Sequence, residues 1–207
     1  IAIVGATGNV GRKLLEVLDK KKFPITEIFL VASPKSVGKK INFKDKELIE
    51  EDLNNFDFSK VKIAFFAAGS AIAEKWAPIA AKKTIVIDNS KFFRKDPEIP
   101  LIVPEVNSKE LIHVKNKNIV SNANCSVIPI VVALKPLHDL YNIKRIVVST
   151  YQSVSGAGKE AMDELLSQTK DYFDNKEMNS KNFTKQIAFN VIPHIDSFLD
   201  NGTTKEE

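Results

Sequence analysis

The stretch IAIVGATGNVG (residues 1–11) decides the fold. Its first part, Ile1–Val4, is wholly apolar and predicts a short buried strand, and apolar residues at helical spacing from Val10 to Leu18 predict a helix. The glycines between them let the backbone turn tightly, and the helix N-terminus stabilises negative charge. The spacing is G-x-x-G-x-x-G. Directly after a buried strand, it predicts a loop that binds the pyrophosphate of a dinucleotide.

Strands and helices alternate further along the chain. Apolar runs predict central strands at Ile28–Ala32, Val61–Ala67, Thr84–Asp88 and Ile119–Ser121, and Ala71–Lys82 predicts a helix. Continuous apolar strands between helices are typical of a parallel sheet that is covered on both faces. We therefore predict an α/β fold with an N-terminal Rossmann-type, doubly wound and mostly parallel sheet over residues 1–122.

The pattern changes around Cys125. Ser126–Leu140 predicts a helix, and a second helix is expected from about Lys159 to Phe173, after a loop of small residues. Residues 123–207 are expected to be the first part of an α+β catalytic and dimerisation domain. Two more strands are predicted in it, at Ile143–Tyr151 and Gln186–Ile192, with a polar loop at Asp174–Lys185 between them.

Composition narrows the function classes. The net charge of +4 is mild, and the lysines are mixed with acids, which favours a solvated surface over a nucleic-acid interface. No apolar run approaches the roughly 20 residues that span a membrane. The single cysteine precludes an internal disulfide and fits a reducing cytoplasm. We expect a cytoplasmic protein that binds a small molecule, without nucleic acid, membrane or metal.

Both ends of the chain suggest a longer protein. Ile1 already lies inside the first predicted strand, and there is no initiator Met. Residues 201–207 resemble a turn, a helix cap and a first acidic turn without the body of a helix.

The turn after the second strand bears on the choice of dinucleotide. An NAD enzyme places an acid there, to accept from the ribose 2′-hydroxyl. Residues 32–36 read Ala-Ser-Pro-Lys-Ser instead, and a lysine between hydroxyls suits a 2′-phosphate. We predict NADP with Lys35 and Ser36 as contacts; the alternative is an ordinary polar turn.

A lone cysteine is more often a small core residue than a nucleophile. Cys125, however, lies in SNANCS (residues 121–126), at a predicted strand-to-helix junction. The helix dipole there stabilises a thiolate, and Asn124 with nearby amides could stabilise an oxyanion. A thiolate beside a nicotinamide indicates acyl transfer to sulfur coupled to hydride transfer.

Taken together, six motifs resemble aspartate-semialdehyde dehydrogenase, in order and from end to end. The resemblance implies a Rossmann-type domain followed by a catalytic and dimerisation domain. It also implies reduction of β-aspartyl phosphate by NADPH to aspartate semialdehyde and phosphate, on the route to lysine, threonine and methionine. The motifs are GATGNVG (5–11), IDNSKFFR (87–94), VPEVN (103–107), SNANCS (121–126), VVSTYQSVSGAGKEAMDEL (147–165) and QIAFNVIPHID (186–196).

The resemblance also implies roles for single residues. Cys125 matches the nucleophile that forms the acyl-thioester, and Gln152 matches the glutamine that orients the substrate. Arg94 matches the arginine that binds the substrate phosphate, assisted by Asn124. Glu206 matches a substrate-contacting acid.

Cofactor contacts are implied in the same way. Many relatives have arginine where Lys35 stands, and lysine keeps the charge but loses the planar fork, so selectivity for the 2′-phosphate is expected to be softer. The implied contacts are Gly5, Thr7, Gly8, Asn9, Val10, Gly11, Lys35, Ser36, Ser70, Ser155, Gly156, Ala157, Gly158, Lys159 and Pro193.

Arg94 and Gln152 suit these roles on physical grounds too. Arg94 follows a strand-end turn and is expected at the carboxyl edge of the sheet, where ligands collect; the alternative is a surface arginine that pairs with Asp96. Gln152 ends a long predicted strand and cannot change its charge, which suits orientation better than proton transfer. Alternatively, Gln152 satisfies backbone groups of the loop.

The family also uses a histidine as general acid and base and an arginine for the substrate carboxylate, both expected beyond Glu207. The histidines present, His113, His138 and His194, are better read as surface or structural residues. We therefore expect the chain as given to be inactive alone. The full-length protein is expected to be a homodimer or a tetramer.

Three other functions stay open. An enzyme like N-acetyl-glutamyl-phosphate reductase shares the architecture and the thioester chemistry, but its glycine loop and cysteine context differ. A phosphorylating glyceraldehyde-phosphate dehydrogenase fits less well, because no acid follows the second strand. The other class is a non-catalytic, regulatory NADP-binding protein, against which the combination of Cys125, Gln152 and Arg94 argues.

Overall fold

The computed structural model describes residues 1–34 and 36–204. The chain divides into two compact units, Ile1–Tyr151 and Gln152–Glu207. Each unit is described by itself. The domain boundary predicted near residue 122 stays a prediction.

The first unit is built on one sheet with the strand order β3-β4-β2-β1-β5-β6-β8-β7. All neighbouring strands are parallel except β3 and β4, which form an antiparallel hairpin. The strands are β1 (Ala2–Val4), β2 (Phe29–Ala32), β3 (Lys40–Phe43), β4 (Lys46–Asp52), β5 (Ile63–Phe66), β6 (Ile85–Asp88), β7 (Leu101–Ile102) and β8 (Ile119–Asn122).

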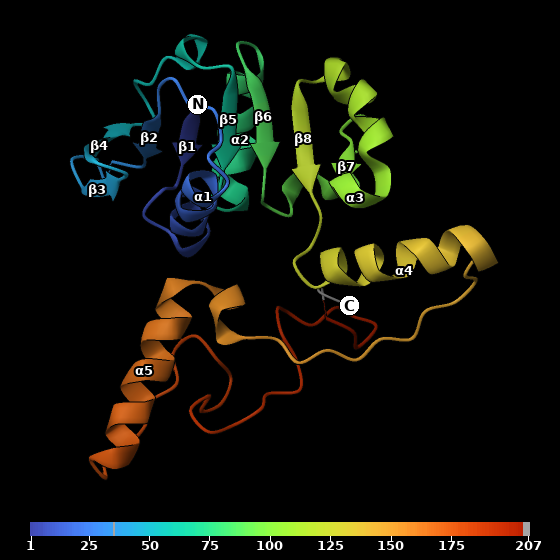
Figure 1. Ribbon diagram of the computed structural model, residues 1–207. Coiled ribbons are helices and arrows are strands. Elements are labelled where there is room, and N and C mark those ends of the chain that lie inside the picture. Colours follow the sequence, from blue (N-terminus) through green and yellow to red (C-terminus); the bar gives the residue numbers. More distant parts are fainter. Residues whose placement is uncertain (35, 205–207) are drawn as a thin grey trace. The chain divides into compact units, whose positions relative to one another are not determined.

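Helices connect the parallel strands (Figure 1). The α-helices are α1 (Asn9–Lys20), α2 (Ser70–Ala81), α3 (Pro104–Asn107), α4 (Val127–Tyr141) and, in the second unit, α5 (Lys159–Phe173). The 3₁₀ segments are η1 (Phe58–Lys60), η2 (Phe92–Lys95), η3 (Ser108–Asn116) and η4 (Val154–Ala157).

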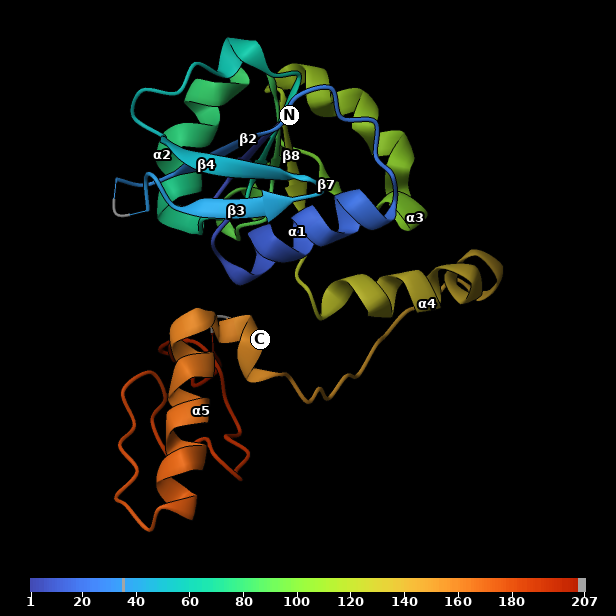
Figure 2. The same cartoon turned by 60° about the vertical axis from the view of Figure 1, so that its left-hand side comes forward.

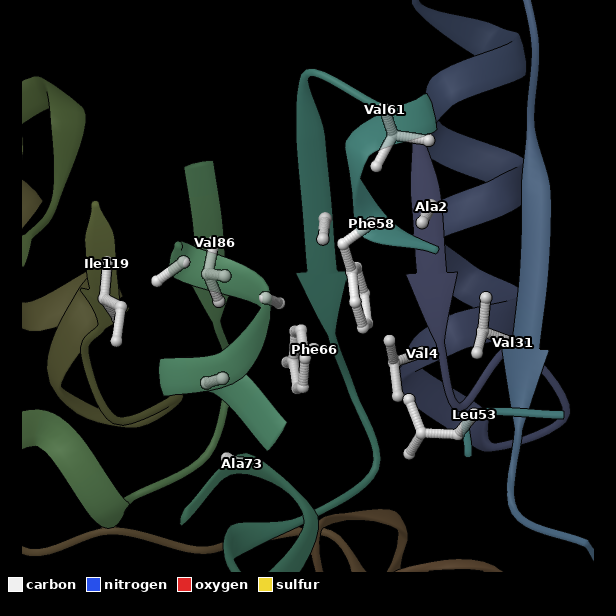
Figure 3. Packing of buried hydrophobic residues seen from close by; sticks show 14 of the residues in the cluster. Ala2, Val4, Val31, Leu53, Phe58, Val61, Phe66, Ala73, Val86 and Ile119 are labelled. Carbon is white, nitrogen blue, oxygen red and sulfur yellow. The ribbon is translucent and has the colours of Figure 1, made fainter. Parts of the chain in front are cut away.

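Two apolar layers, one on each face of the sheet, form the core. Side chains alternate along a strand, so Ile3 packs with the α1 residues Leu15 and Leu18, while Val4 packs on the opposite face. Helix α2 covers that opposite face (Figure 2), where its Ala73 belongs to the same apolar cluster as Phe66 of β5 (Figure 3). Burial of Phe66, which is 1% exposed, contributes about 1.5–3 kcal/mol.

The predicted α/β fold with a mostly parallel sheet is confirmed. Its central strands lie within two residues of their predicted bounds, and so do the helices α1, α2, α4 and α5. The hairpin of β3 and β4 was not predicted. Its strands are rich in Lys and Glu, and it turns at Lys44, which has a φ of 53° although it is not glycine.

The predicted strand at Ile143–Tyr151 is wrong: these residues have no regular secondary structure. A strand needs a neighbour for its N–H and C=O groups, and none of the described strands pairs with this segment. Its apolar side chains are accordingly exposed, Val147 at 80% and Tyr151 at 92%. An apolar groove of about 370 Å³ lies where residues 143–146 meet α3 and α4.

The described part of the second unit consists of the short 3₁₀ segment η4, the α-helix α5 and an irregular chain that is hydrogen-bonded to α5. Gln168 is 1% exposed, and its Oε1 accepts from the N–H groups of Ile187 (2.9 Å) and Ala188 (3.0 Å). One turn earlier, Glu164 Oε2 accepts from the backbone N–H of Asn182 at 2.6 Å. Two helix side chains therefore satisfy backbone groups that would otherwise need a sheet.

The predicted strand at Gln186–Ile192 is therefore also wrong. Gln168 binds two of its N–H groups, and Phe189 has a φ of 57°, which no strand accommodates. The polar segment before it, Asp174–Lys185, is irregular as predicted.

The loop between β1 and α1 requires glycine for two separate reasons. Gly5 has a φ of 91°, a conformation that side chains disfavour, and a Cβ there would lie 2.9 Å from the carbonyl oxygen of Ala67. Gly11, inside α1, lies so close to the loop that a Cβ would stand 2.3 Å from the Gly5 oxygen. The helix thus reaches the strand only because Gly11 has no side chain.

We predict that Gly11→Ala destabilises the first unit by about 2–3 kcal/mol, because backbone atoms cannot move aside for the methyl group. This cost exceeds the gain of about 1 kcal/mol from alanine's helix propensity. Urea unfolding, followed by the fluorescence of the single tryptophan, Trp76 in α2, measures it.

Gly8→Ala is the matched control, since a Cβ at Gly8 would lie 3.4 Å from the Gly5 oxygen, an ordinary contact. Its stability should stay within about 0.5 kcal/mol of the wild type. Equal unfolding midpoints for the two variants would show that the close approach of Gly11 costs nothing.

Candidate active site

The glycine loop lies at the carboxyl edge of the central strands. Gly5 donates from its N–H to Val31 O in β2 at 2.8 Å, and Ala67, just after β5, donates to Val4 O at 2.9 Å. Gly8 is the N-cap of α1 and has no side chain to cap the helix. The predicted residues Thr7, Asn9 and Val10 line the same turn. Ligands collect at this edge of a doubly wound sheet, as predicted for the loop.

Ser70 is the first residue of α2 and follows Gly69, which has a φ of 85°. A Cβ on Gly5 would meet both Ala67 and Ala68, so the glycine loop and the segment before Ser70 are packed together. Two predicted cofactor contacts from distant parts of the sequence therefore share one edge.

The turn after β2 carries Ser36, while Lys35 lies outside the described residues. Ser36 donates from its N–H to Ser33 O at 2.9 Å, and Lys39 donates to Ser36 O at 3.2 Å. Two successive turns therefore hold Ser36. Because β2 pairs with β1 in parallel, this turn and the glycine loop follow neighbouring strands at the same edge.

Glu50 in β4 is a buried acid beneath this edge. It is 1% exposed, and neither carboxylate oxygen makes a hydrogen bond of normal geometry with residues 1–34 or 36–204. Burial raises the pKa of Glu50, while the nearby N–H and hydroxyl of Thr7 and the charges of Lys39 and Arg12 lower it in part. The net direction is upward, because loss of solvation dominates.

Arg94 lies in η2, just after β6. Its Nε donates to the carbonyl oxygen of Asn122 at 3.0 Å, across a separation of 28 residues. The alternative pairing with Asp96 is not found among the ion pairs of the described residues; Asp96 instead accepts from Glu98 N–H at 2.9 Å. The guanidinium is therefore held beside the end of β8, three residues before Cys125.

A polar network fixes the turn that carries Arg94. Asp88, fully buried at the end of β6, accepts from Ser90 N–H at 3.0 Å and from Ser90 Oγ at 2.7 Å. Asn122 Nδ2 donates to Asn89 Oδ1 at 2.6 Å. Burial raises the pKa of Asp88, and the bonds from Ser90 and the charge of Arg94 oppose that rise. The network ties β6 and β8 together at their carboxyl ends.

Cys125 lies in the turn between β8 and α4, as predicted, and its side chain is exposed. Asn124 shapes that turn, because its Oδ1 accepts from Ser126 N–H at 2.7 Å and from Val127 N–H at 3.4 Å. The Asn124 oxygen thus occupies the first amides of α4, which were expected to be available to an oxyanion. Asn124 holds the loop that presents Cys125.

The other predicted contacts lie in the second unit. Gln152 and Pro193 are exposed, and Ser155–Ala157 lie within η4. Gly158 has a φ of 99° and forms the N-cap of α5. The ammonium of Lys159 pairs with the carboxylate of Asp163 one turn later. Glu206 lies outside the described residues.

Neither a membrane-spanning helix nor a cluster of three potential metal ligands is found among the described residues. None of their helices is long and apolar enough to cross a membrane. No group of three His, Cys, Asp or Glu side chains among residues 1–34 and 36–204 is arranged to hold a metal ion. His194 Nε2 lies 3.4 Å from Thr184 Oγ1, and its ring packs against that of Phe198. His113 Nε2 lies 3.5 Å from Glu110 Oε2.

Two family models match the chain. Residues 1–114 match the NAD-binding domain of semialdehyde dehydrogenase, and residues 134–207 match the dimerisation domain of the same family. The chain belongs to the semialdehyde dehydrogenase family. Residues 1–114 of the first unit accordingly form a nicotinamide-dinucleotide-binding domain, in agreement with the glycine loop.

Within this semialdehyde dehydrogenase family, two similar relatives are aspartate-semialdehyde dehydrogenases. Aspartate-semialdehyde dehydrogenase 2 of Vibrio cholerae is 51% identical over 208 residues, which cover 100% of this chain and 62% of the relative. Aspartate-semialdehyde dehydrogenase of Aquifex aeolicus is 51% identical over 210 residues, with the same shares. The resemblance inferred from the motifs is therefore confirmed along the whole chain, which spans about 62% of these relatives.

Solved structures agree with this family assignment. Aspartate semialdehyde dehydrogenase II from Vibrio cholerae, complexed with ASA, matches with a TM-score of 0.97 at 51% identity, over 100% of this chain and 62% of that one. A probable aspartate-semialdehyde dehydrogenase from Pseudomonas aeruginosa matches with a TM-score of 0.90 at 30% identity, over 99% and 61%.

Some residues of the site were not singled out from the sequence. The Asn89–Asn122 contact joins residues 33 positions apart, and Glu50 lies in a strand that was not predicted. A strand-end Asp-Asn-Ser sequence does favour a capped turn, so the role of Asp88 was within reach of sequence reasoning. The burial of Glu50 depends on the β3–β4 hairpin. That hairpin was not predicted from the sequence, because its strands contain many charged residues.

We predict that the stability of Glu50→Gln relative to the wild type depends on pH. Because the folded-state pKa of Glu50 is raised, the folded protein binds more protons, and its stability falls as the pH rises from the ordinary glutamate range through the raised value. Glutamine has no such titration. The advantage of the variant should be absent near pH 4 and should grow towards neutral pH.

Urea unfolding of both proteins across this pH range measures the difference. A stability difference that is constant with pH would show that burial does not perturb Glu50 in the folded protein.

Proposed function

We propose that the full-length protein is an NADP-dependent aspartate-semialdehyde dehydrogenase. In this proposal it reduces β-aspartyl phosphate to aspartate semialdehyde and phosphate through a thioester on Cys125, in the biosynthesis of lysine, threonine and methionine. The observation that carries the proposal is local to the first unit. The exposed thiol of Cys125 lies between β8 and α4, and Arg94 donates a hydrogen bond to the carbonyl oxygen of Asn122 at the end of β8.

The glycine loop fits a dinucleotide. A Cβ on Gly5 or Gly11 would collide with backbone, so the loop keeps its path only with glycine, and Gly8 leaves the N-terminus of α1 uncovered. Backbone amides at that N-terminus would hold the pyrophosphate. The lysine and serine of the following turn, Lys35 and Ser36, are proposed to select NADP by binding its 2′-phosphate.

Cys125 is proposed to attack the acyl carbon of the substrate. The sulfur forms a bond to that carbon, the bond from carbon to the phosphate oxygen breaks, and the phosphate leaves with the electron pair. The α4 N-terminus favours the attacking thiolate. Exposure of Cys125 in the turn gives the substrate access to the sulfur.

Arg94 is proposed to hold the departing phosphate. The hydrogen bond from Arg94 Nε to Asn122 O fixes the orientation of the guanidinium. Its two terminal nitrogens are then available to donate to two phosphate oxygens. The Asp88 network keeps this anchor in place. Asn124 assists by holding the turn that presents the nucleophile.

The bound cofactor would supply the hydride that reduces the thioester carbonyl. The oxyanion formed in this way on Cys125 would re-form the carbonyl bond and release the aldehyde, and the sulfur would leave as a thiolate with the electrons of the broken carbon–sulfur bond. Gln152 is proposed to orient the acyl group through its uncharged amide. Ser155, Gly158, Lys159 and Pro193 are proposed further cofactor contacts, and Glu206 a substrate contact.

The dimerisation domain in residues 134–207 supports a homodimer, and we propose this assembly for the full-length protein in the cytoplasm. The histidine acid–base and the carboxylate-binding arginine would come from the part of the relatives that this chain does not span. The chain as given is accordingly proposed to be inactive alone.

We predict that the full-length protein forms NADPH from aspartate semialdehyde, phosphate and NADP, followed by absorbance. Cys125→Ala should lower this rate by about a thousandfold or more, because it removes the proposed carrier of the acyl intermediate. The variant should still bind NADP, which serves as the control for folding.

Phosphate-dependent NADPH formation that survives in Cys125→Ala would refute the thioester route. No turnover by a folded full-length protein that binds NADP would refute the enzyme and favour a cofactor-binding role.

A further inference from the structure

The turn after β2 presents a second lysine to the same edge as Ser36. The Nζ of Lys39 donates to Ser36 Oγ at 3.3 Å, and its side chain is exposed. In the described parts of the chain, no carboxylate lies within 4 Å of this ammonium. Lys39 therefore carries a positive charge next to a hydroxyl, and no ion pair within residues 1–34 and 36–204 neutralises it.

Lys40, the next residue, differs from Lys39 because its ammonium is paired with a carboxylate. Lys40, at the start of β3, directs its Nζ to Glu47 Oε1 at 2.7 Å in the β3–β4 hairpin. The charge of Lys40 is thus neutralised within the hairpin. Two adjacent lysines of equal charge therefore differ in what they offer to a ligand.

The main chain fixes the position of Lys39. Gly38 N–H donates to Glu50 O at 3.0 Å, and Glu50 N–H donates to Lys39 O at 2.9 Å. Strand β4, which pairs with β2 through Leu30 and Glu50, thereby clamps the turn on both sides of the lysine. The buried Glu50 side chain lies near enough that the charge of Lys39 lowers its pKa in part. The lysine is anchored by its backbone, while its ammonium stays exposed.

This edge suits the phosphate on the adenosine ribose. A dinucleotide whose pyrophosphate lies on the glycine loop after β1 places its adenosine ribose by the end of the neighbouring strand, β2. A 2′-phosphate carries up to two negative charges and several acceptor oxygens, so it gains from a second cation beside a hydroxyl. An unphosphorylated ribose has no such charge.

We propose that Lys39 is a specificity-determining residue that binds the 2′-phosphate of NADP together with Ser36, and so selects NADP over NAD. The proposal rests on the proposed function, since it assumes that the glycine loop binds this cofactor. Lys39 was not among the cofactor contacts predicted from the sequence, Lys35 and Ser36. It is proposed to discriminate NADP from NAD because its ammonium lies beside the Ser36 hydroxyl.

The test measures the dissociation constants of NADP, NAD and adenosine 2′,5′-bisphosphate for the full-length protein by titration calorimetry. Lys39→Gln should weaken NADP and the bisphosphate about tenfold, the loss expected for one charged hydrogen bond, and leave NAD within about twofold. Lys39→Arg keeps the charge and should retain most of the preference. Lys40→Gln, the matched control, should bind all three ligands like the wild type.

Several outcomes would overturn the assignment. These are unchanged NADP affinity in Lys39→Gln, an equal loss for NAD, or an equal effect of Lys40→Gln, which would indicate a general charge effect. The wild type separates the two proposals. If it binds NADP no more tightly than NAD, the NADP assignment itself fails, whereas a preference that survives in Lys39→Gln refutes only the role of Lys39.

Discussion

The close approach of α1 to the loop after β1 is the constraint on which the first unit depends. Gly11 lies where a Cβ would stand 2.3 Å from the Gly5 oxygen, so backbone packs directly on backbone. That contact aims the N-terminus of α1 at the carboxyl edge of the sheet. Strand β1 lies between β2 and β5 and pairs with both in parallel, so that the loops after all three strands meet at one edge. The proposed cofactor site is a consequence of this packing.

The same edge continues across β6 and β8, where polar contacts replace close packing. Asp88 holds its own turn through Ser90, and the Asn122 carbonyl receives Arg94. Asn124 then caps the start of α4 and so fixes the loop around Cys125. Arg94, the proposed phosphate contact, and Cys125, the proposed nucleophile, thus follow two neighbouring strands. Burying these polar groups costs solvation free energy. Their hydrogen bonds hold the Arg94 side chain and the Cys125 loop in defined orientations, which apolar packing alone does not do.

Much of this could be predicted from sequence, because the decisive signals are local. A continuous apolar strand, a glycine turn and an amphipathic helix lie within the first 20 residues, and the Cys125 turn lies directly between a strand and a helix. The failures concern partners distant in sequence. Ile143–Tyr151 has strand composition but no described neighbour to pair with, and the backbone of Ile187 is bound by a helix side chain, Gln168. Periodicity describes a segment, whereas a strand is a property of a pair.

The central claim is that Cys125 carries the acyl group, and trapping that group tests it most directly. The full-length protein would be incubated with aspartate semialdehyde and NADP in the absence of phosphate, digested at low pH and examined by mass spectrometry. The account predicts an aspartyl adduct on the Cys125 peptide that depends on NADP and disappears when phosphate is added. NADPH formation without any adduct on Cys125, or an adduct on another residue, would contradict it.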